Sequence, residues 1–332
     1  MAASSLPDGR AACPHPSPPP EGEGETRERT VTAQRTALDQ NRWHWQHGPI
    51  DIVAEAHGTA DAVAAAHEAA WQRFCSVLGE LVLELPLLRQ PVGQECLLRG
   101  PVARRMWHAC APFRAGFITP MAAVAGSVAQ ELIGFYNRPG IERAWLNNGG
   151  DIALHLAPGQ SVRVGLYADL ARFDLRDLDD MSIDGRFEVT ADMPVRGVAT
   201  SGWRGRSFSL GIADSVTVLA ATASEADAAA TVIANAVDVR DAGIGRRPAN
   251  ECKDDSDLGD TPVTVDVDTL APSQVRRALD AGVARALALQ RAGLIVSAVL
   301  VCQGRYRAVE ALCSAPAVPG PLQPLAVGSV FA

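Results

Sequence analysis

The stretch from residue 117 to residue 151 constrains the fold most strongly, because it combines a helix start, a small-residue helix, a strand and a polar glycine turn. Thr119 is a good N-cap and Pro120 suits the first helical position, so a helix with free backbone N–H groups is predicted to begin here. Such a helix end attracts anions. One helix face has almost no side chains, which lets another backbone element approach closely; its small residues are Ala122, Ala125, Gly126 and Ala129.

A hairpin is predicted directly after this helix. Residues 143–146 and 152–156 have the composition of two short strands. Between them lies Asn147-Asn148-Gly149-Gly150-Asp151, and Asn and Gly adopt positive φ angles at low cost, as a tight turn requires. One interpretation is a hairpin beside a buried helix, and the other is a pocket lined by bare backbone.

Composition favours a soluble globular protein of one large domain or two ordinary ones. The chain has 332 residues, of which 47% are hydrophobic, and its net charge is −8, so it lacks the basic footprint of a nucleic-acid-binding protein. The seven cysteines are odd in number and never spaced C-x-x-C, which fits a reducing cytosol. No apolar run reaches the roughly 18 residues of a membrane span. We therefore expect a cytoplasmic protein.

Segment composition divides the chain into three parts. Residues 1–33 are rich in Pro, Gly and Glu and are expected to form a disordered tail, residues 34–311 one domain, and residues 312–332 a loose Pro-rich tail. Residues 240–262 are polar and charged and are expected to form a long loop. Periodicity predicts helices at 59–85, 100–112, 222–237 and from 273, and strands at 43–53 (two segments), 162–166, 196–200, 215–221, 263–267 and 294–302.

Asp227 and Thr231 are the candidate metal ligands. They lie four positions apart on a predicted helix and so share one face, where their oxygens suit Mg²⁺. The alternative is that Ser224 and Asp227 form a capping box, which needs no metal. The acidic residues between 254 and 260 are either a solvated surface or a cation site. Ser201 has no G-x-S-x-G motif around it and is interpreted as a turn serine.

Eight segments carry a family resemblance, in order, over roughly residues 35–305. The segments are HGPID (47–51), GPVARRM (100–106), FITPMAAVAG (117–126), NNGGDIALHL (147–156), GVATSG (197–202), ADSVTVLA (213–220), RRPANECKDDSDLG (246–259) and VTVDV (263–267). By these segments the chain resembles the ApbE-like uncharacterised protein family, the UPF-0280 group, and this family is distantly similar to the Mg²⁺-dependent FAD:protein FMN transferase ApbE.

The resemblance implies an α+β fold, a single ApbE-like domain with mixed or antiparallel sheets packed on helices. It also implies Mg²⁺ and FAD as cofactors, with Asp227 and Thr231 as metal ligands and a backbone carbonyl near residues 122–125 completing the shell. Two departures from the transferase are visible: residues 203–214 contain no histidine motif, and 117–126 contain no lysine. The implied cofactor-binding residues are Thr119, Pro120, Met121, Ala122, Asn148, Gly149, Gly150, Asp151, Thr200, Ser201, Gly202 and Arg204.

Three functions are compatible with these residues. The first is a metal-dependent flavin- or nucleotide-binding enzyme in which an arginine from 204, 206, 246 or 247 neutralises charge on phosphorus. The second, which only the family resemblance implies, is a different reaction in the same pocket, in sulfur assimilation toward homocysteine or in nicotinate or cyclic-amide catabolism. For the sulfur reaction Cys110 or Cys252 is the candidate thiol, with a buried, inert cysteine as the alternative for either. The third is a non-catalytic partner subunit. The expected partner is a protein substrate or partner enzyme, a homo-oligomer is compatible with the sequence, and no catalytic residue is assigned.

Overall fold

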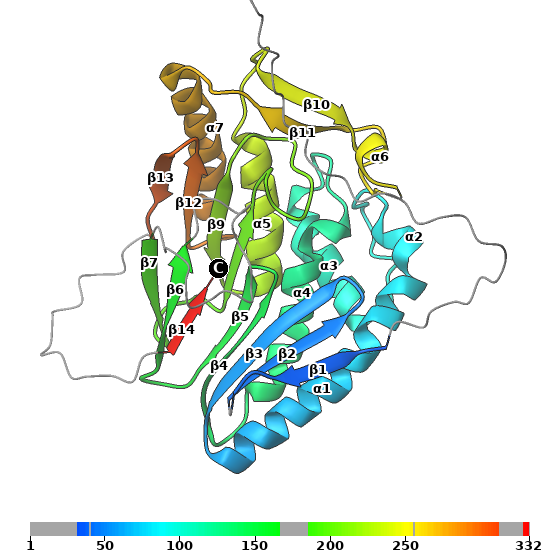
Figure 1. Cartoon of the computed structure of the whole chain (residues 1–332), viewed down its shortest axis with the longest axis vertical. Coiled ribbons are helices and arrows are strands. Elements are labelled where there is room, and N and C mark those ends of the chain that lie inside the picture. The colour runs from blue at the N-terminus through cyan, green and yellow to red at the C-terminus, as the bar shows by residue number, and fades with distance from the viewer. Residues whose placement is uncertain (1–31, 40, 167–184, 255, 312–327, 332) are drawn as a thin grey trace, which may run out of the picture. The chain divides into compact units, whose positions relative to one another are not determined.

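A nine-stranded sheet organises the part of the chain that the structure describes. This structure is a computed structural model, and it describes residues 32–39, 41–166, 185–254, 256–311 and 328–331. Every neighbouring pair in the sheet is antiparallel (Figure 1). The strands, in spatial order, are β1 (Gln34–Ala37), β2 (Arg42–His47), β3 (Ile50–Gly58), β4 (Ile141–Asn148), β5 (Asp151–Leu156), β8 (Gly197–Ser201), β9 (Ser215–Ala220), β12 (Ser297–Cys302) and β13 (Arg305–Val309).

Two smaller sheets complete the strands. β6 (Ser161–Leu166) pairs antiparallel with β7 (Gly185–Thr190) and parallel with β14 (Gly328–Phe331). β10 (Ile244–Pro248) and β11 (Pro262–Val267) form a separate antiparallel pair. The chain therefore mixes parallel and antiparallel pairs with helices, which confirms the predicted α+β class.

The longer helices cover one face of the large sheet, while β6, β7 and β14 lie on the other (Figure 1). Side chains alternate accordingly, since Leu146 of β4 packs toward the helices and Trp145 packs toward β6 and β7. The α-helices are α1 (Ala60–Leu83), α2 (Leu85–Leu88), α3 (Pro101–Cys110), α4 (Val124–Ile133), α5 (Ala223–Ala236), α6 (Ala249–Cys252) and α7 (Pro272–Arg291), and the 3-10 turns are η1 (Ala111–Phe113), η2 (Pro120–Ala123) and η3 (Gly134–Tyr136).

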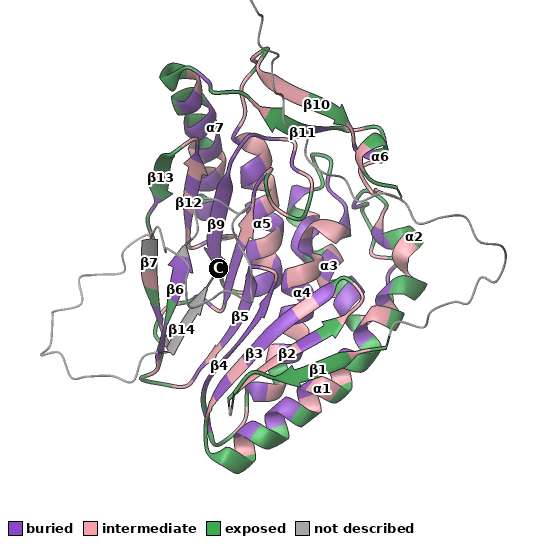
Figure 2. Cartoon of the chain, in the orientation of Figure 1, coloured by how far each residue is buried: buried purple, intermediate pink, exposed green. Residues whose placement is uncertain are grey.

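Helix α5 is the central element of the helical layer. It packs against β8 and β9 on the sheet and against α4 and α7 beside it. Its alanines are good helix formers and small enough for close packing on several sides, and Ala226, Ala229, Ala230 and Ala234 are fully buried. Figure 2 shows the contrast with α1, which is buried along one face and exposed along the other.

Most of the periodic elements are confirmed. The hairpin has the predicted glycine turn, in which Gly149 and Gly150 have φ angles of 68° and 110°. Strand β9 is buried along its whole length, as its continuous apolar run predicts. The two segments predicted within residues 43–53 are β2 and β3.

The helices that follow Thr119 and Thr222 begin where predicted, but three predicted side-chain caps are wrong. A 3-10 turn, η2, precedes α4, and the Thr119 side chain does not cap it because its hydroxyl donates to Asp257 instead. Helix α5 is capped by Thr222, which accepts from the Glu225 N–H at 3.3 Å, so the capping box proposed for Ser224 does not form. Helix α7 begins after Ala271, with Pro272 at its first position, and not at a Ser273 cap.

The predicted loop at 240–262 is also wrong, because it contains β10 and α6. The strands β10 and β11 carry polar residues on both faces, so they do not show the apolar alternation by which a strand is predicted. Arg246 of β10 donates to the Leu210 carbonyl and to Asp238. The short strands β1, β7 and β13 were not predicted, and β14 lies in the segment expected to be loose. The expectations for residues 1–31 and 312–327 fall outside the described residues, as do residues 173–183, for which the acidic composition predicts an exposed connection. Among the described helices, none combines the length and the hydropathy needed to cross a bilayer.

Candidate functional site

The candidate site lies where the first turn of α4 meets α5. A Cβ atom on Gly126 would lie 2.3 Å from the Ala223 carbonyl oxygen and 2.9 Å from the Asp227 Cβ, so only glycine allows this approach. The Gly126 N–H donates to Asp227 Oδ2 at 2.9 Å. The predicted close approach along the small-residue face is thus confirmed, and its partner is the helix that carries Asp227.

The glycine turn of the β4–β5 hairpin borders the same place. Asn148 donates from Nδ2 to the Ala125 carbonyl at 3.1 Å, which ties the turn to the start of α4. Asp151, the first residue of β5, accepts from the Thr200 N–H at 3.2 Å, which ties it to β8. Four of the predicted residues, Asn148, Asp151, Thr200 and Asp227, are therefore held by hydrogen bonds around one helix start.

Asp151 and Asp227 interact as two carboxyls in a buried environment. Burial raises the pKa of Asp227 to about 7, although the backbone N–H groups of Gly126 and Ala125 oppose the rise. Burial and the neighbouring Asp227 also raise the pKa of Asp151 well above its usual value. Two like charges brought together out of water disfavour double ionisation, so the pair retains protons near neutral pH. A divalent cation would relieve this repulsion.

Arg206 is the arginine that the structure places at this pair. Its Nη1 lies 3.0 Å from the position that a Cβ of Gly149 would occupy, and its Nη2 donates to the Pro49 carbonyl at 3.1 Å. Its charge lowers the pKa of Asp151, against the effect of burial. Gly149 therefore leaves room for the guanidinium beside the turn.

The other three candidate arginines have acidic partners elsewhere. Arg204, which was predicted to bind cofactor, lies 3.7 Å from Asp214 and over the Trp203 ring. Arg246 is paired with Asp238 at 2.5 Å, and Arg247 lies 3.7 Å from Glu251. Sequence alone named all four, because a count of arginines cannot tell which of them reaches the glycine turn.

The predicted helix start contributes differently from expectation. Thr119 is 2% exposed and its hydroxyl donates to Asp257 at 2.5 Å, so part of the acidic segment packs on it and is not simply solvated. Pro120 is buried, and its carbonyl lies 4.0 Å from the Cys110 Sγ. Met121 packs toward the α1 side of the core and Ala122 toward the α5 side.

The remaining predicted residues lie at the edge of the site. Thr231 is half-buried, one turn after Asp227 on α5, and Ser201 is half-buried at the end of β8. Gly202 packs against backbone, since a Cβ there would lie 2.3 Å from the Asp214 carbonyl oxygen. Within the described residues, Ser201 makes no hydrogen bond with a histidine, and it is the last residue of β8 and not part of a turn.

The donor set fits a hard cation. Within the described ranges, no three His, Cys, Asp or Glu side chains are grouped so as to hold a metal. A cation here would take the Asp227 and Asp151 carboxylates, together with hydroxyl or carbonyl oxygens such as that of Thr231. An all-oxygen set of this kind suits Mg²⁺ and not a metal that prefers nitrogen or sulfur.

Comparison with known proteins identifies the family of the chain. A model of the family described as AbpE bacteria matches residues 34–308. The chain belongs to this ApbE-like family. The resemblance to this family that the eight segments predicted is therefore confirmed.

Curated relatives in the family carry the name UPF0280 protein. One from Methanopyrus kandleri is 41% identical over 157 residues, covering 46% of this chain and 56% of the relative. Another, from Methanospirillum hungatei, is 32% identical over 168 residues, covering 49% and 63%. The chain thus spans less than two thirds of the length of these relatives. A solved ApbE protein from Thermotoga maritima is 15% identical, with a TM-score of 0.32 and coverage of 76% and 75%.

Proposed function

We propose that this family member is a metal-dependent enzyme that binds a flavin or a related nucleotide through its phosphates. The observation that carries the proposal is the pair of carboxyls of Asp151, which is buried, and Asp227, which is half-buried, held against a helix start with Arg206 beside them. Buried carboxyls with raised pKa values are destabilising unless a cation or a proton neutralises them, so they are typical of functional sites.

Each residue has a distinct role in this proposal. Asp227 and Asp151 hold Mg²⁺, with Thr231 as a further oxygen ligand. Bound Mg²⁺ would neutralise charge on phosphate oxygens. Arg206 and the Gly149-Gly150 turn face the phosphates, where the guanidinium offers paired N–H donors and the glycines let a ligand approach the backbone.

The absence of the histidine motif is compatible with these residue roles. Phosphoryl transfer depends mainly on positioning and on electrostatic stabilisation, and little covalent chemistry is needed from the protein. By its family resemblance, the expected acceptor is a hydroxyl of a partner protein.

A sulfur reaction through Cys110 is disfavoured. The thiol is fully buried, and both burial and Asp227 raise its pKa well above the usual value. Only the thiolate is an effective nucleophile, so this cysteine is held in its unreactive form.

An FAD titration tests the proposal. The purified chain is titrated with FAD by fluorescence quenching, with and without Mg²⁺, and the bound nucleotide is then separated by chromatography. Saturable binding that Mg²⁺ strengthens, with AMP appearing, is expected. Asp227→Asn should weaken the Mg²⁺-dependent part at least about tenfold, which corresponds to about 1.4 kcal/mol.

The matched control is Asp192→Asn, which removes an exposed carboxylate. It should bind as the wild type does. Wild-type protein that binds no FAD in either condition, or Asp227→Asn protein indistinguishable from wild type, would overturn the proposal. Binding without turnover, together with a stable complex with another protein, would favour the non-catalytic subunit.

A further inference from the structure

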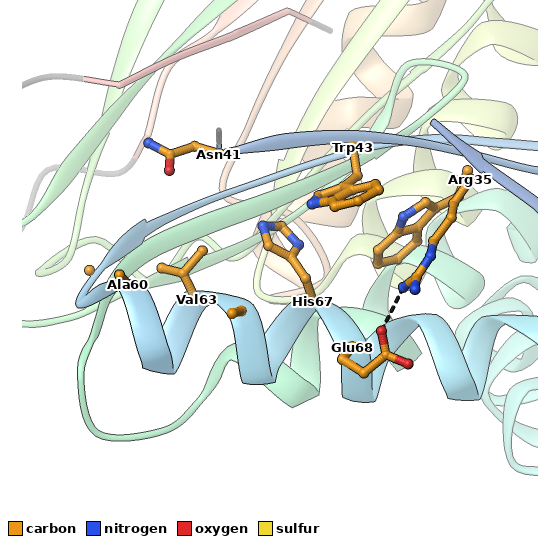
Figure 3. Close-up of a pocket in the computed structure, with 10 residues that line it drawn as sticks. Arg35, Asn41, Trp43, Ala60, Val63, His67 and Glu68 are labelled. Carbon is orange, nitrogen blue, oxygen red and sulfur yellow. Dashed lines mark hydrogen bonds and ion pairs between the residues drawn. The ribbon is translucent and has the colours of Figure 1, made fainter. Parts of the chain in front are cut away.

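A cavity of about 480 Å³ lies between α1 and the strands β1 and β2 (Figure 3). It shares no lining residue with the candidate site. Its volume is in the range of small-molecule sites. We call it the tryptophan pocket; its polar and aromatic lining comes from Arg35, Asn41, Trp43, Trp45, His67 and Glu68.

Two buried ring nitrogens in this pocket have no hydrogen-bond partner among the described residues: Trp45 Nε1 and His67 Nε2. Trp45 is 1% exposed and His67 is 6% exposed, so bulk water does not hydrogen-bond to these nitrogens freely. The two rings lie edge to face, with centroids 6.4 Å apart. A buried polar group without a partner costs about 1–3 kcal/mol. A bound molecule that accepts hydrogen bonds from both nitrogens would remove this cost.

His67 offers a donor to the pocket. Its Nδ1 lies 2.8 Å from the hydroxyl of Tyr136, which is fully buried. Nδ1 is the acceptor available to that phenol within the described residues, so the phenol donates to it and the proton of the neutral ring lies on Nε2. The Asn41 carbonyl accepts from the Ala56 N–H at 3.3 Å. It also lies near the His67 ring and raises the pKa of His67 against the effect of burial, but it does not have the geometry of a hydrogen bond with Nε2. Trp45 Nε1 is a donor by its chemistry.

The charges of the pocket also favour an acceptor. Glu68 is its one carboxylate, and it pairs with Arg35 at 2.6 Å (Figure 3). The Arg35 guanidinium also lies over the Trp43 and Trp71 rings, at 5.4 and 5.1 Å. No unpaired anion in the lining attracts a cation. Indole faces and the small side chains of α1, such as Val63 and Ala64, provide apolar walls.

We propose that the tryptophan pocket binds a small planar molecule that carries a carbonyl or carboxylate oxygen. The oxygen accepts hydrogen bonds from Trp45 Nε1 and His67 Nε2, and the ring packs against the tryptophans. This is a ligand site separate from the proposed phosphate site, so it stands or falls independently of flavin binding.

Benzoate and benzamide are the probes, because they present a carboxylate and a neutral carbonyl on the same ring. The full chain is titrated with each by calorimetry, with benzylamine as the probe that has no oxygen acceptor. Saturable binding of benzoate or benzamide below about 5 mM is expected, and none of benzylamine. The difference between the two binders tells whether the site prefers the charged or the neutral oxygen.

Two helix variants give a matched comparison. Ala64 lines the pocket and Ala65 does not, and both are exposed on α1. Ala64→Phe should therefore abolish binding while Ala65→Phe leaves it unchanged. Trp45→Phe keeps a ring but removes Nε1–H, and should weaken binding roughly three- to tenfold.

The alanine pair keeps the test decisive even if Trp45→Phe fails to fold, because neither position is buried. The proposal is overturned if neither oxygen-bearing probe binds saturably, if benzylamine binds as well as they do, or if Ala64→Phe and Ala65→Phe bind alike.

Discussion

The backbone N–H of Gly126 donates to the Asp227 carboxylate at 2.9 Å, although the two residues are 101 positions apart in the chain. One contact therefore serves both packing and electrostatics. It fixes α4 against α5, and it holds a carboxyl whose pKa burial raises to about 7. Changes at either residue should affect the fold and the site together.

Gly126→Ala should destabilise the protein by about 2–3 kcal/mol, because the new Cβ would lie 2.3 Å from the Ala223 carbonyl oxygen and the helices would have to separate. Urea unfolding followed by circular dichroism measures the change. The nearby Gly134 is the control, since a Cβ there meets nothing within 4 Å. Gly134→Ala should be neutral or stabilising by up to about 1 kcal/mol. Equal effects of the two substitutions would show that the approach of α4 to α5 is not tight.

Asp227→Asn should stabilise the metal-free protein at pH 8, by on the order of 1 kcal/mol, and have a smaller effect at pH 5. A carboxyl with a raised folded pKa contributes stability that is fully present below its usual pKa of 3.8 and is lost as pH rises from there to about 7. At pH 8 the wild type must ionise Asp227 beside Asp151, whereas the variant carries no ionisable group at position 227.

Thermal unfolding at both pH values, with and without Mg²⁺, measures this. Mg²⁺ should raise the wild-type melting temperature at pH 8 more than at pH 5, because protons compete for the carboxylates, and should not raise that of Asp227→Asn. A wild-type response to Mg²⁺ that the substitution leaves unchanged would place the cation elsewhere.

Arg206→Ala should weaken FAD binding about tenfold or more, and Arg204→Ala should change it less than about threefold. Arg206 lies beside Gly149 and acts on Asp151, whereas Arg204 is engaged with Asp214 and Trp203. Titration of both variants under the same Mg²⁺ concentration compares them directly. The reverse order of effects would mean that the phosphates lie nearer the β8 loop than the glycine turn.

Local patterns in the sequence were sufficient for the elements that surround the site. The β4–β5 turn follows from Asn and Gly chemistry, and β9 and α5 from their periodicity. The close packing at Gly126 could also be predicted from the sequence, because glycine inside a helix lowers its stability and therefore indicates a position where another element must approach closely.

Relationships between distant segments could not be predicted in this way. The Thr119 hydroxyl has the chemistry of an N-cap, yet it donates to Asp257, which is 138 positions away. The choice of Arg206 over Arg204 depends on where the loop after β8 passes the glycine turn. The two unpartnered nitrogens of Trp45 and His67 depend on how β2 meets α1, since neither residue belongs to a motif.

Acid should destabilise the protein through His67, in the opposite sense to Asp227. Burial lowers the pKa of His67 to about 4 from the usual 6.5. A histidine with a depressed folded pKa is buried neutral, so its stability is fully present above pH 6.5 and is lost as pH falls toward 4, where the unfolded chain binds a proton that the folded one does not. The loss over this window is about 3 kcal/mol.

His67→Gln removes the titrating group and should flatten the dependence of unfolding free energy on pH between 6.5 and 4. Urea unfolding across that range, with His108→Gln at an exposed position as control, measures it. A slope that persists in His67→Gln would assign the acid sensitivity to other groups, and a slope lost in His108→Gln would contradict the role of burial.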